Sequence, residues 1–104
     1  ERLFLDPNLS LKKLADRLNT NTKYLSQVVN HCSGHNFQHF INTYRIKAIE
    51  ELIREGQHHH LTLFGLAQQC GFKNKSTFYK VFKDLKGETP NAYLKSQLRG
   101  QTDA

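Results

Sequence analysis

The sequence lacks any long apolar run, and it also lacks the alternating pattern of a β-strand. No segment approaches the roughly 20 apolar residues that a membrane-spanning helix requires, and no signal peptide opens the chain. No stretch alternates apolar and polar residues with a period of two, so we expect no sheet. The chain is therefore expected to be an all-α, soluble, cytoplasmic segment that makes no membrane contact.

Cysteines and acidic residues are also scarce. The two cysteines, Cys32 and Cys70, fall on the apolar sides of expected helices. This indicates buried thiols in a reducing compartment, with a disulfide between the two as the alternative. Nine Asp and Glu stand against fifteen Lys and Arg, which gives a net charge of +6 and a pI near 9.5. A pI above about 9 is one mark of a nucleic-acid-binding domain.

The chain does contain a series of amphipathic helices separated by short polar turns. Apolar residues recur at steps of three and four, and Ser10, Thr22, Thr62 and Thr89-Pro90 mark helix starts. The 104 residues suffice for one small domain with a modest core. The expected helices cover residues 11–18, 23–30, 37–54, 63–70 and 75–85, with a last helix from Pro90, the end of an earlier helix at 3–5 and a frayed tail at 99–104.

The helix pairs repeat along the chain. Residues 9–34 and residues 61–87 both contain a helix, a short polar turn, a second helix and a loop with glycine. This is the order of a helix-turn-helix unit, whose second helix presents side chains to base edges. The helix that joins the units, at about 37–55, spans about 27 Å, near the ~34 Å of one DNA turn. The alternative is a helical bundle in which the pairs are only packing units. The expected inward residues of the second helices are Leu25, Val28 and Val29 in the first pair and Phe78, Val81, Phe82 and Leu85 in the second.

A family resemblance is strongest over residues 67–93. The residues that carry it are Ala67, Cys70-Gly71-Phe72, Ser76, Phe78, Phe82-Lys83, Gly87, Thr89-Pro90 and Tyr93, and in the first half Leu14-Ala15, Tyr24-Leu25-Ser26, Asn30, Gly34, Phe37 and Tyr44-Arg45-Ile46. With them the chain resembles the DNA-binding domain of AraC/XylS-type transcription regulators over about residues 3–98. The resemblance implies a seven-helix domain at residues 1–98, in which two helix-turn-helix units are joined by a linker helix.

The resemblance also implies which residues contact DNA. The implied base-reading residues are Lys23, Ser26 and Gln27 on the first recognition helix and Lys75, Ser76, Thr77 and Lys80 on the second; Asn74 and Lys83 lie toward phosphates, and Arg45 lies either there or in packing. Gln27 can pair bidentately with adenine, and Lys75 or Lys80 can donate to guanine. Lys80 and Leu94 stand where the family often has arginine, so the planar fork that favours guanine is absent at position 80 and a polar contact of the last helix is in doubt.

The implied function is sequence-specific binding of double-stranded DNA by a transcription regulator, an activator that also touches RNA polymerase. A sensory or dimerisation region is expected ahead of residue 1, as a small-molecule, phosphorelay or membrane-bound sensor. The alternative is a protein–protein interaction bundle that kept the fold without the DNA function. We expect no enzyme, cofactor or metal site. The consecutive His58, His59 and His60 lack the spacing that puts two ligands on one helical face, and no nucleophile–base pair stands out.

Overall fold

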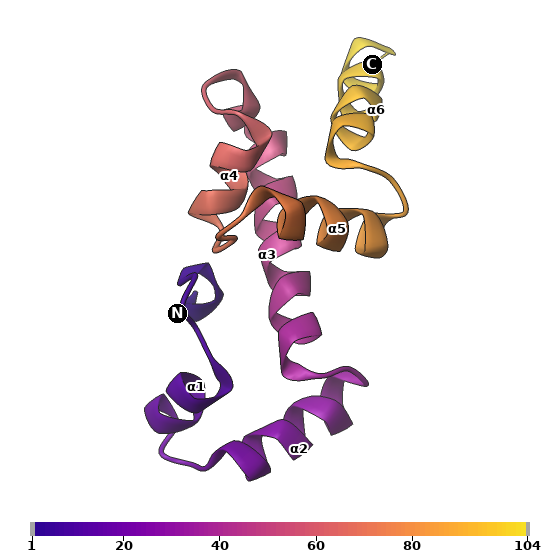
Figure 1. The fold of residues 1–104 in the computed structure, drawn as a ribbon. Helices are drawn as coiled ribbons and strands as arrows, with labels where there is room; N and C mark the ends of the chain where they lie inside the picture. The colour runs from indigo at the N-terminus through magenta and orange to yellow at the C-terminus, as the bar shows by residue number, and fades with distance from the viewer. Residues whose placement is uncertain (1, 104) are drawn as a thin grey trace.

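Six α-helices and two short 3-10 helices form the part of the chain that the computed structural model describes, residues 2–103, with side chains described through Gln97 (Figure 1). No strand occurs in residues 2–103, which confirms the all-helical class. The α-helices are α1 (Leu11–Arg17), α2 (Thr22–Ser33), α3 (Phe37–Arg54), α4 (Leu63–Gln69), α5 (Lys75–Lys86) and α6 (Pro90–Asp103), and the 3-10 helices are η1 (Leu3–Leu5) and η2 (Gln57–His59).

The expected seven-helix count is wrong for the described residues, because the first expected helix is only the 3-10 turn η1. Arg2, at its N-terminal boundary, has a ψ of 66°, which is outside the helical region, and Pro7 follows soon after. The other end differs as well. The tail expected to fray from residue 99 continues α6 through Asp103, and Ala104 lies outside the described residues.

Capping side chains set most of the helix starts. Ser10, Thr62 and Thr89 accept hydrogen bonds from backbone N–H groups three residues later, as predicted. The cap of α2 is Asn21 and not Thr22: the Asn21 side-chain oxygen accepts from the Tyr24 N–H at 2.8 Å. An asparagine at this position leaves Thr22 free to be the first helical residue, and α2 extends to Ser33, beyond the expected end at residue 30.

The two helix pairs correspond closely in structure. Each second helix, α2 and α5, has 12 residues, begins after an asparagine cap and ends at a left-handed glycine. The caps Asn21 and Asn74 are 53 positions apart, as are the end glycines Gly34 and Gly87, whose φ angles are 76° and 79°. This correspondence relates every position of α2 to one position of α5.

The helix α3 contributes to two separate cores. The smaller core joins the first pair to α3 through Ala15, Leu25 and Val29 with Phe40 at its edge. Figure 1 shows α2 crosswise at one end of α3 and α5 crossing α3 farther along. The molecule is elongated, with extents of 49 × 25 × 25 Å. The larger core consists of Ile46, Ala48, Ile49, Ile53, Leu66, Ala67, Cys70, Phe72, Phe78, Phe82 and Tyr93.

Two expectations about burial need correction. Val28 is 37% exposed, because the small first core closes over Leu25 and Val29 only. Cys32 is exposed, since it lies near the end of α2 beyond that core, whereas Cys70 is buried as expected. Both cysteines are free thiols. Burial of Cys70 raises its pKa to about 11.

Candidate nucleic-acid interface

The helix α5 is held by its apolar face and presents a basic one. Phe78 and Phe82 are fully buried, and the Phe82 ring packs edge-on against Tyr93 with ring centroids 5.3 Å apart. Behind the end of α5, the Glu50 carboxylate pairs with Lys86 Nζ at 3.1 Å and accepts from the Tyr93 hydroxyl at 3.1 Å. These contacts fix α5 against α3 and α6. The predicted DNA-contacting residues Lys75, Ser76, Thr77, Lys80 and Lys83 are all exposed.

Asn74 has a structural role at the start of α5. Its side-chain oxygen accepts a hydrogen bond from the Thr77 N–H at 2.8 Å, which caps the helix. The side chain is exposed, and its amide N–H₂ group has no partner among the described residues. The cap therefore uses the carbonyl oxygen, and the amide donor group of Asn74 is exposed at the positive end of the helix.

The exposed face of α2 differs in part from the expected one. Lys23 and Gln27 are exposed, but Ser26 is only partly exposed. The 53-residue correspondence explains this, because Ser26 matches Tyr79, which packs beside the large core. Lys23 and Gln27 match Ser76 and Lys80. Ser26 therefore lies at the margin of this face.

Three side chains on the outer faces were missed by sequence reasoning. Tyr24 is 58% exposed and occupies the position that matches Thr77. His31 and Asp84, which match each other, are both exposed one turn beyond Gln27 and Lys80. The 53-residue repeat was the signal that would have found them. It was obscured because the turn between the helices is one residue longer in the second pair than in the first.

Arg45 does not lie on the exposed surface, so of the two roles open to it the structure supports packing. The side chain is buried, and its Nε and Nη2 donate to the carbonyl oxygens of Phe4 and Asp6 at 2.7 and 2.9 Å. Burial lowers the pKa of Arg45, and the nearby Asp6 carboxylate opposes that shift. One N–H on each of Nε and Nη2 is used in these bonds, and because the side chain is buried it is not presented to a phosphate in this conformation.

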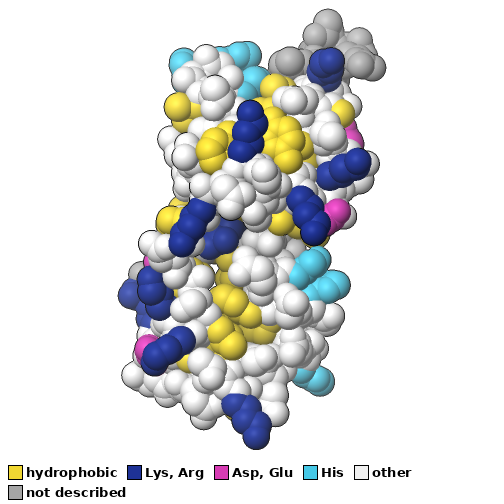
Figure 2. Space-filling model, viewed as in Figure 1, with side chains coloured by type: hydrophobic (Ala, Val, Ile, Leu, Met, Phe, Trp, Pro, Cys, Tyr) yellow, Lys and Arg dark blue, Asp and Glu magenta, His cyan; other side chains and the backbone are white. Residues whose placement is uncertain are grey.

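A hollow lies between α3 and α5. It has a volume of about 460 Å³ and lies between the first turns of α3 and the face of α5 that carries Thr77 and Lys80. Gln38 and Asn42 of α3 line it and also line a second hollow toward Asn74. Basic side chains are spread over both halves of the face shown in Figure 2, with few acidic ones among them.

Known proteins share this arrangement of helices. A family model described as a helix-turn-helix domain matches residues 14–96, from the middle of α1 into α6. The C-terminal domain of AraT, a response regulator from Geobacillus stearothermophilus, superimposes with a TM-score of 0.77 at 27% identity, covering 89% of this chain and 74% of that one. The chain belongs to the AraC/XylS-type helix-turn-helix family. This family consists of DNA-binding transcription regulators and not of enzymes.

Relatives of this AraC-type domain are much longer proteins. The transcriptional regulator AdiY of Escherichia coli (strain K12) is 35% identical over 103 residues, 98% of this chain and 32% of AdiY. The uncharacterized regulator YtdP of Bacillus subtilis (strain 168) is 28% identical over 88 residues, 85% of this chain and 11% of YtdP. In residues 2–103 no helix is long and apolar enough to cross a membrane. The described side chains contain no group of three or more potential metal ligands.

Proposed function

We propose that this AraC-type domain binds double-stranded DNA sequence-specifically by placing α2 and α5 in successive major grooves. The observation that supports this most is the correspondence of the two helices, each 12 residues long, capped by asparagine, ended by glycine and polar on its outer face. They pack at different places along α3, which has 18 residues and so a length of about 27 Å. Successive major grooves on one face of DNA are ~34 Å apart.

The outer faces suggest a role for each side chain. On α5, Lys80 donates to guanine O6 or N7 as a single ammonium, while Ser76 and Thr77 approach base edges and Lys75 lies at the start of the helix. Lys75 also leans toward Tyr79, with its Nζ 5.7 Å from the ring centroid. Phosphate contacts come from Lys83 and from the Asn74 amide together with the N-terminal turn of α5.

The recognition helix of the first pair, α2, would read bases with a different set of side chains. Gln27 pairs with adenine and Lys23 donates to a base or phosphate, with Ser26 at the margin. Tyr24 adds an exposed ring that can contact a thymine methyl group, and His31 flanks Gln27. The half-site under α2 is therefore read mainly through amide and aromatic chemistry.

The proposal extends to the whole regulator. The domain acts in the cytoplasm as part of an activator that touches RNA polymerase, and sensing or dimerisation resides in another region of the polypeptide. AraT and the response regulator yesN from Fusobacterium nucleatum, whose C-terminal domains resemble this chain, support a regulator of more than one domain.

A selection experiment tests DNA binding directly. The 104-residue chain would be used to select duplexes from a randomised double-stranded library. We expect a selected site with two separated half-sites, and Lys80→Ala and Gln27→Ala each weaken its binding by about 5- to 100-fold at one half-site. Lys47→Ala and Gln69→Ala are matched controls, because both residues are exposed but lie outside α2 and α5. Recovery of no duplex at low salt contradicts the proposal and favours a protein–protein interaction bundle.

A further inference from the structure

The N-terminal segment, residues 2–6, is tied to the middle of the fold by one buried side chain. Arg45 of α3 is 6% exposed, and it donates from Nε to the Phe4 carbonyl oxygen and from Nη2 to the Asp6 carbonyl oxygen. Its partners lie 41 and 39 positions earlier in the chain. Both are backbone groups, so the contact depends on where the segment runs and little on its side chains.

The same arginine is pressed against the turn between α4 and α5. Gly71, in that turn, has a φ of 104°, and a Cβ there would lie 2.6 Å from Arg45 Nε and 2.7 Å from the Phe4 carbonyl oxygen. The guanidinium also lies over the Phe72 ring, 5.9 Å from its centroid. Residues 2–6, Arg45 and the α4–α5 turn are therefore packed too closely for a side chain at position 71.

This contact continues to α5. Phe72 packs on Phe78, with ring centroids 5.5 Å apart, and Phe78 is a fully buried residue of α5. The first pair has no equivalent: Asn19, the left-handed residue of its turn, is exposed. Each turn closes with one similar hydrogen bond, from the Thr20 N–H to the Ala15 carbonyl and from the Phe72 N–H to the Ala67 carbonyl.

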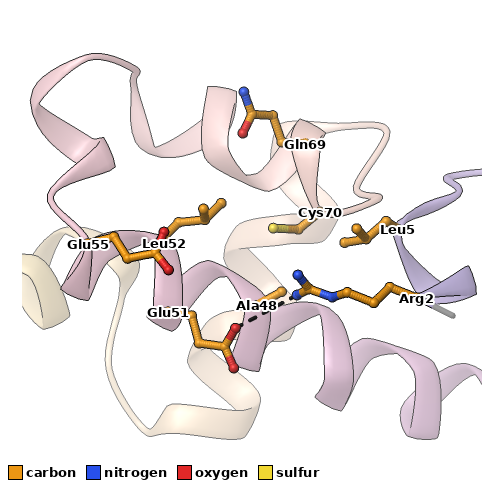
Figure 3. A pocket seen from close by; sticks show the side chains of 8 residues that line it. All are labelled: Arg2, Leu5, Ala48, Glu51, Leu52, Glu55, Gln69 and Cys70. Atoms are coloured by element: carbon orange, nitrogen blue, oxygen red, sulfur yellow. Dashed lines mark ion pairs between the residues drawn. The ribbon is translucent and has the colours of Figure 1, made fainter.

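The other side of the segment is anchored as well (Figure 3). Arg2 pairs with Glu51 of α3 at 3.8 Å, and Leu5 lines a hollow of about 180 Å³ together with Cys70, which ends α4. Residues 2–6 thus lie against α3 and against the first residues of the α4–α5 turn, Cys70 and Gly71. They act as a brace on the second helix pair. Leu3 and Phe4 also line a hollow with Leu14 and Phe40 at the edge of the smaller core, but no residue of α2 lines either hollow.

We propose that Arg45 is a positioning residue that couples residues 2–6 to the α4–α5 turn and so sets how α5 meets DNA, without touching DNA itself. The inference rests on the proposed function for α5. Loss of the Arg45 contacts loosens the second turn and impairs reading by α5, whereas α2 keeps its own core and its half-site.

Hydrogen exchange tests the coupling without DNA. The variants are Arg45→Lys, which keeps the charge but offers one nitrogen, and Arg45→Met, with Arg54→Met as a control at an exposed arginine of the same helix. In Arg45→Lys we expect exchange of the Phe72 N–H to accelerate about tenfold or more and that of the Thr20 N–H to stay unchanged. Equal acceleration of both amides, or of neither, overturns the proposal. Arg45→Lys gives this result even where Arg45→Met fails to fold.

A half-site experiment tests the consequence for DNA. The probe is the duplex selected by the unaltered chain, with one half-site scrambled at a time. For Arg45→Lys, scrambling the α5 half-site should lower the affinity by less than about 3-fold, because α5 already reads poorly. Scrambling the α2 half-site should lower the affinity as much as it does for the unaltered chain. Equal loss at both half-sites indicates a general structural role and overturns the positioning role. If the unaltered chain selects no duplex, the proposed function fails, and the exchange result still decides the coupling.

Discussion

Alkaline pH should destabilise this domain through one buried thiol. Cys70 is 2% exposed, and burial raises its pKa from an ordinary 9.0 to about 11, with Arg2 lowering the value and Glu51 raising it to smaller extents. The unfolded chain loses the thiol proton near the ordinary pKa, whereas the folded chain retains it. The contribution to stability is therefore complete below about pH 9 and is lost as the pH rises toward the folded pKa.

The size of the effect follows from the two pKa values. Each unit of difference corresponds to about 1.4 kcal/mol, so the full loss of unfolding free energy is about 3 kcal/mol. About 2 kcal/mol of it should be lost between about pH 8 and about pH 11, because the folded thiol is still half protonated at its own pKa. That loss is a large part of the roughly 5–15 kcal/mol typical of a domain. Tyr93, whose pKa burial and Glu50 raise to about 12, adds to the loss at the upper end.

Urea unfolding followed by circular dichroism measures the effect at a series of pH values. Cys70→Val removes the titrating group at similar volume, so its stability should fall less steeply with pH, by about 2 kcal/mol over the range. Cys32→Val is the matched control, because that thiol is exposed. The contribution of Tyr93 is common to all three proteins and cancels in the comparison. Parallel pH profiles for the unaltered chain and Cys70→Val would refute the reasoning.

Three further predictions concern α5. Phe82→Ala should lower the unfolding free energy by about 3–5 kcal/mol, because a fully buried ring is lost from the core, and a thermal shift under a few degrees would contradict this. Lys83→Ala should reduce the slope of log affinity against log salt by about 1 with little change in sequence preference, so an altered selected sequence would argue against a phosphate contact. Asn74→Asp should keep the helix cap, with stability within about 0.5 kcal/mol, yet weaken DNA binding through its negative charge. Unchanged binding at low salt would exclude a role for the Asn74 amide toward phosphate.

Local chemistry was visible in the sequence, and long-range contacts were not. Ser10, Thr62 and Thr89 were identified as helix caps, since capping depends on residues only three positions apart. The role of Arg45 depends on carbonyl groups about 40 positions away, which no helical pattern reports. Cys32 lies on the same helix as Leu25 and Val29, but the small core ends before it. Periodicity defines a face, and only the fold shows how far along that face the core extends.

The predicted reading face of α2 differs from its exposed face at one residue for another reason. Ser26 was grouped with Lys23 and Gln27 by resemblance alone, although its structural match is Tyr79 at the edge of the core. The extra residue in the second turn shifts the correspondence from 52 positions at the first-helix caps, Ser10 and Thr62, to 53 at the second-helix caps. A comparison with one fixed offset therefore misaligns one helix of each pair.

When α2 and α5 are matched at an offset of 53 residues, their exposed faces differ in chemistry. The matched pairs are Lys23 with Ser76, Tyr24 with Thr77, Gln27 with Lys80 and His31 with Asp84. Apolar positions behind them stay apolar, as Leu25 with Phe78 and Val29 with Phe82. The repeat thus retains the packing and changes the side chains that would meet bases. Because α2 and α5 follow one another along a single chain and run in a similar direction in Figure 1, the proposed function implies two half-sites of different sequence, arranged in tandem and not as a palindrome.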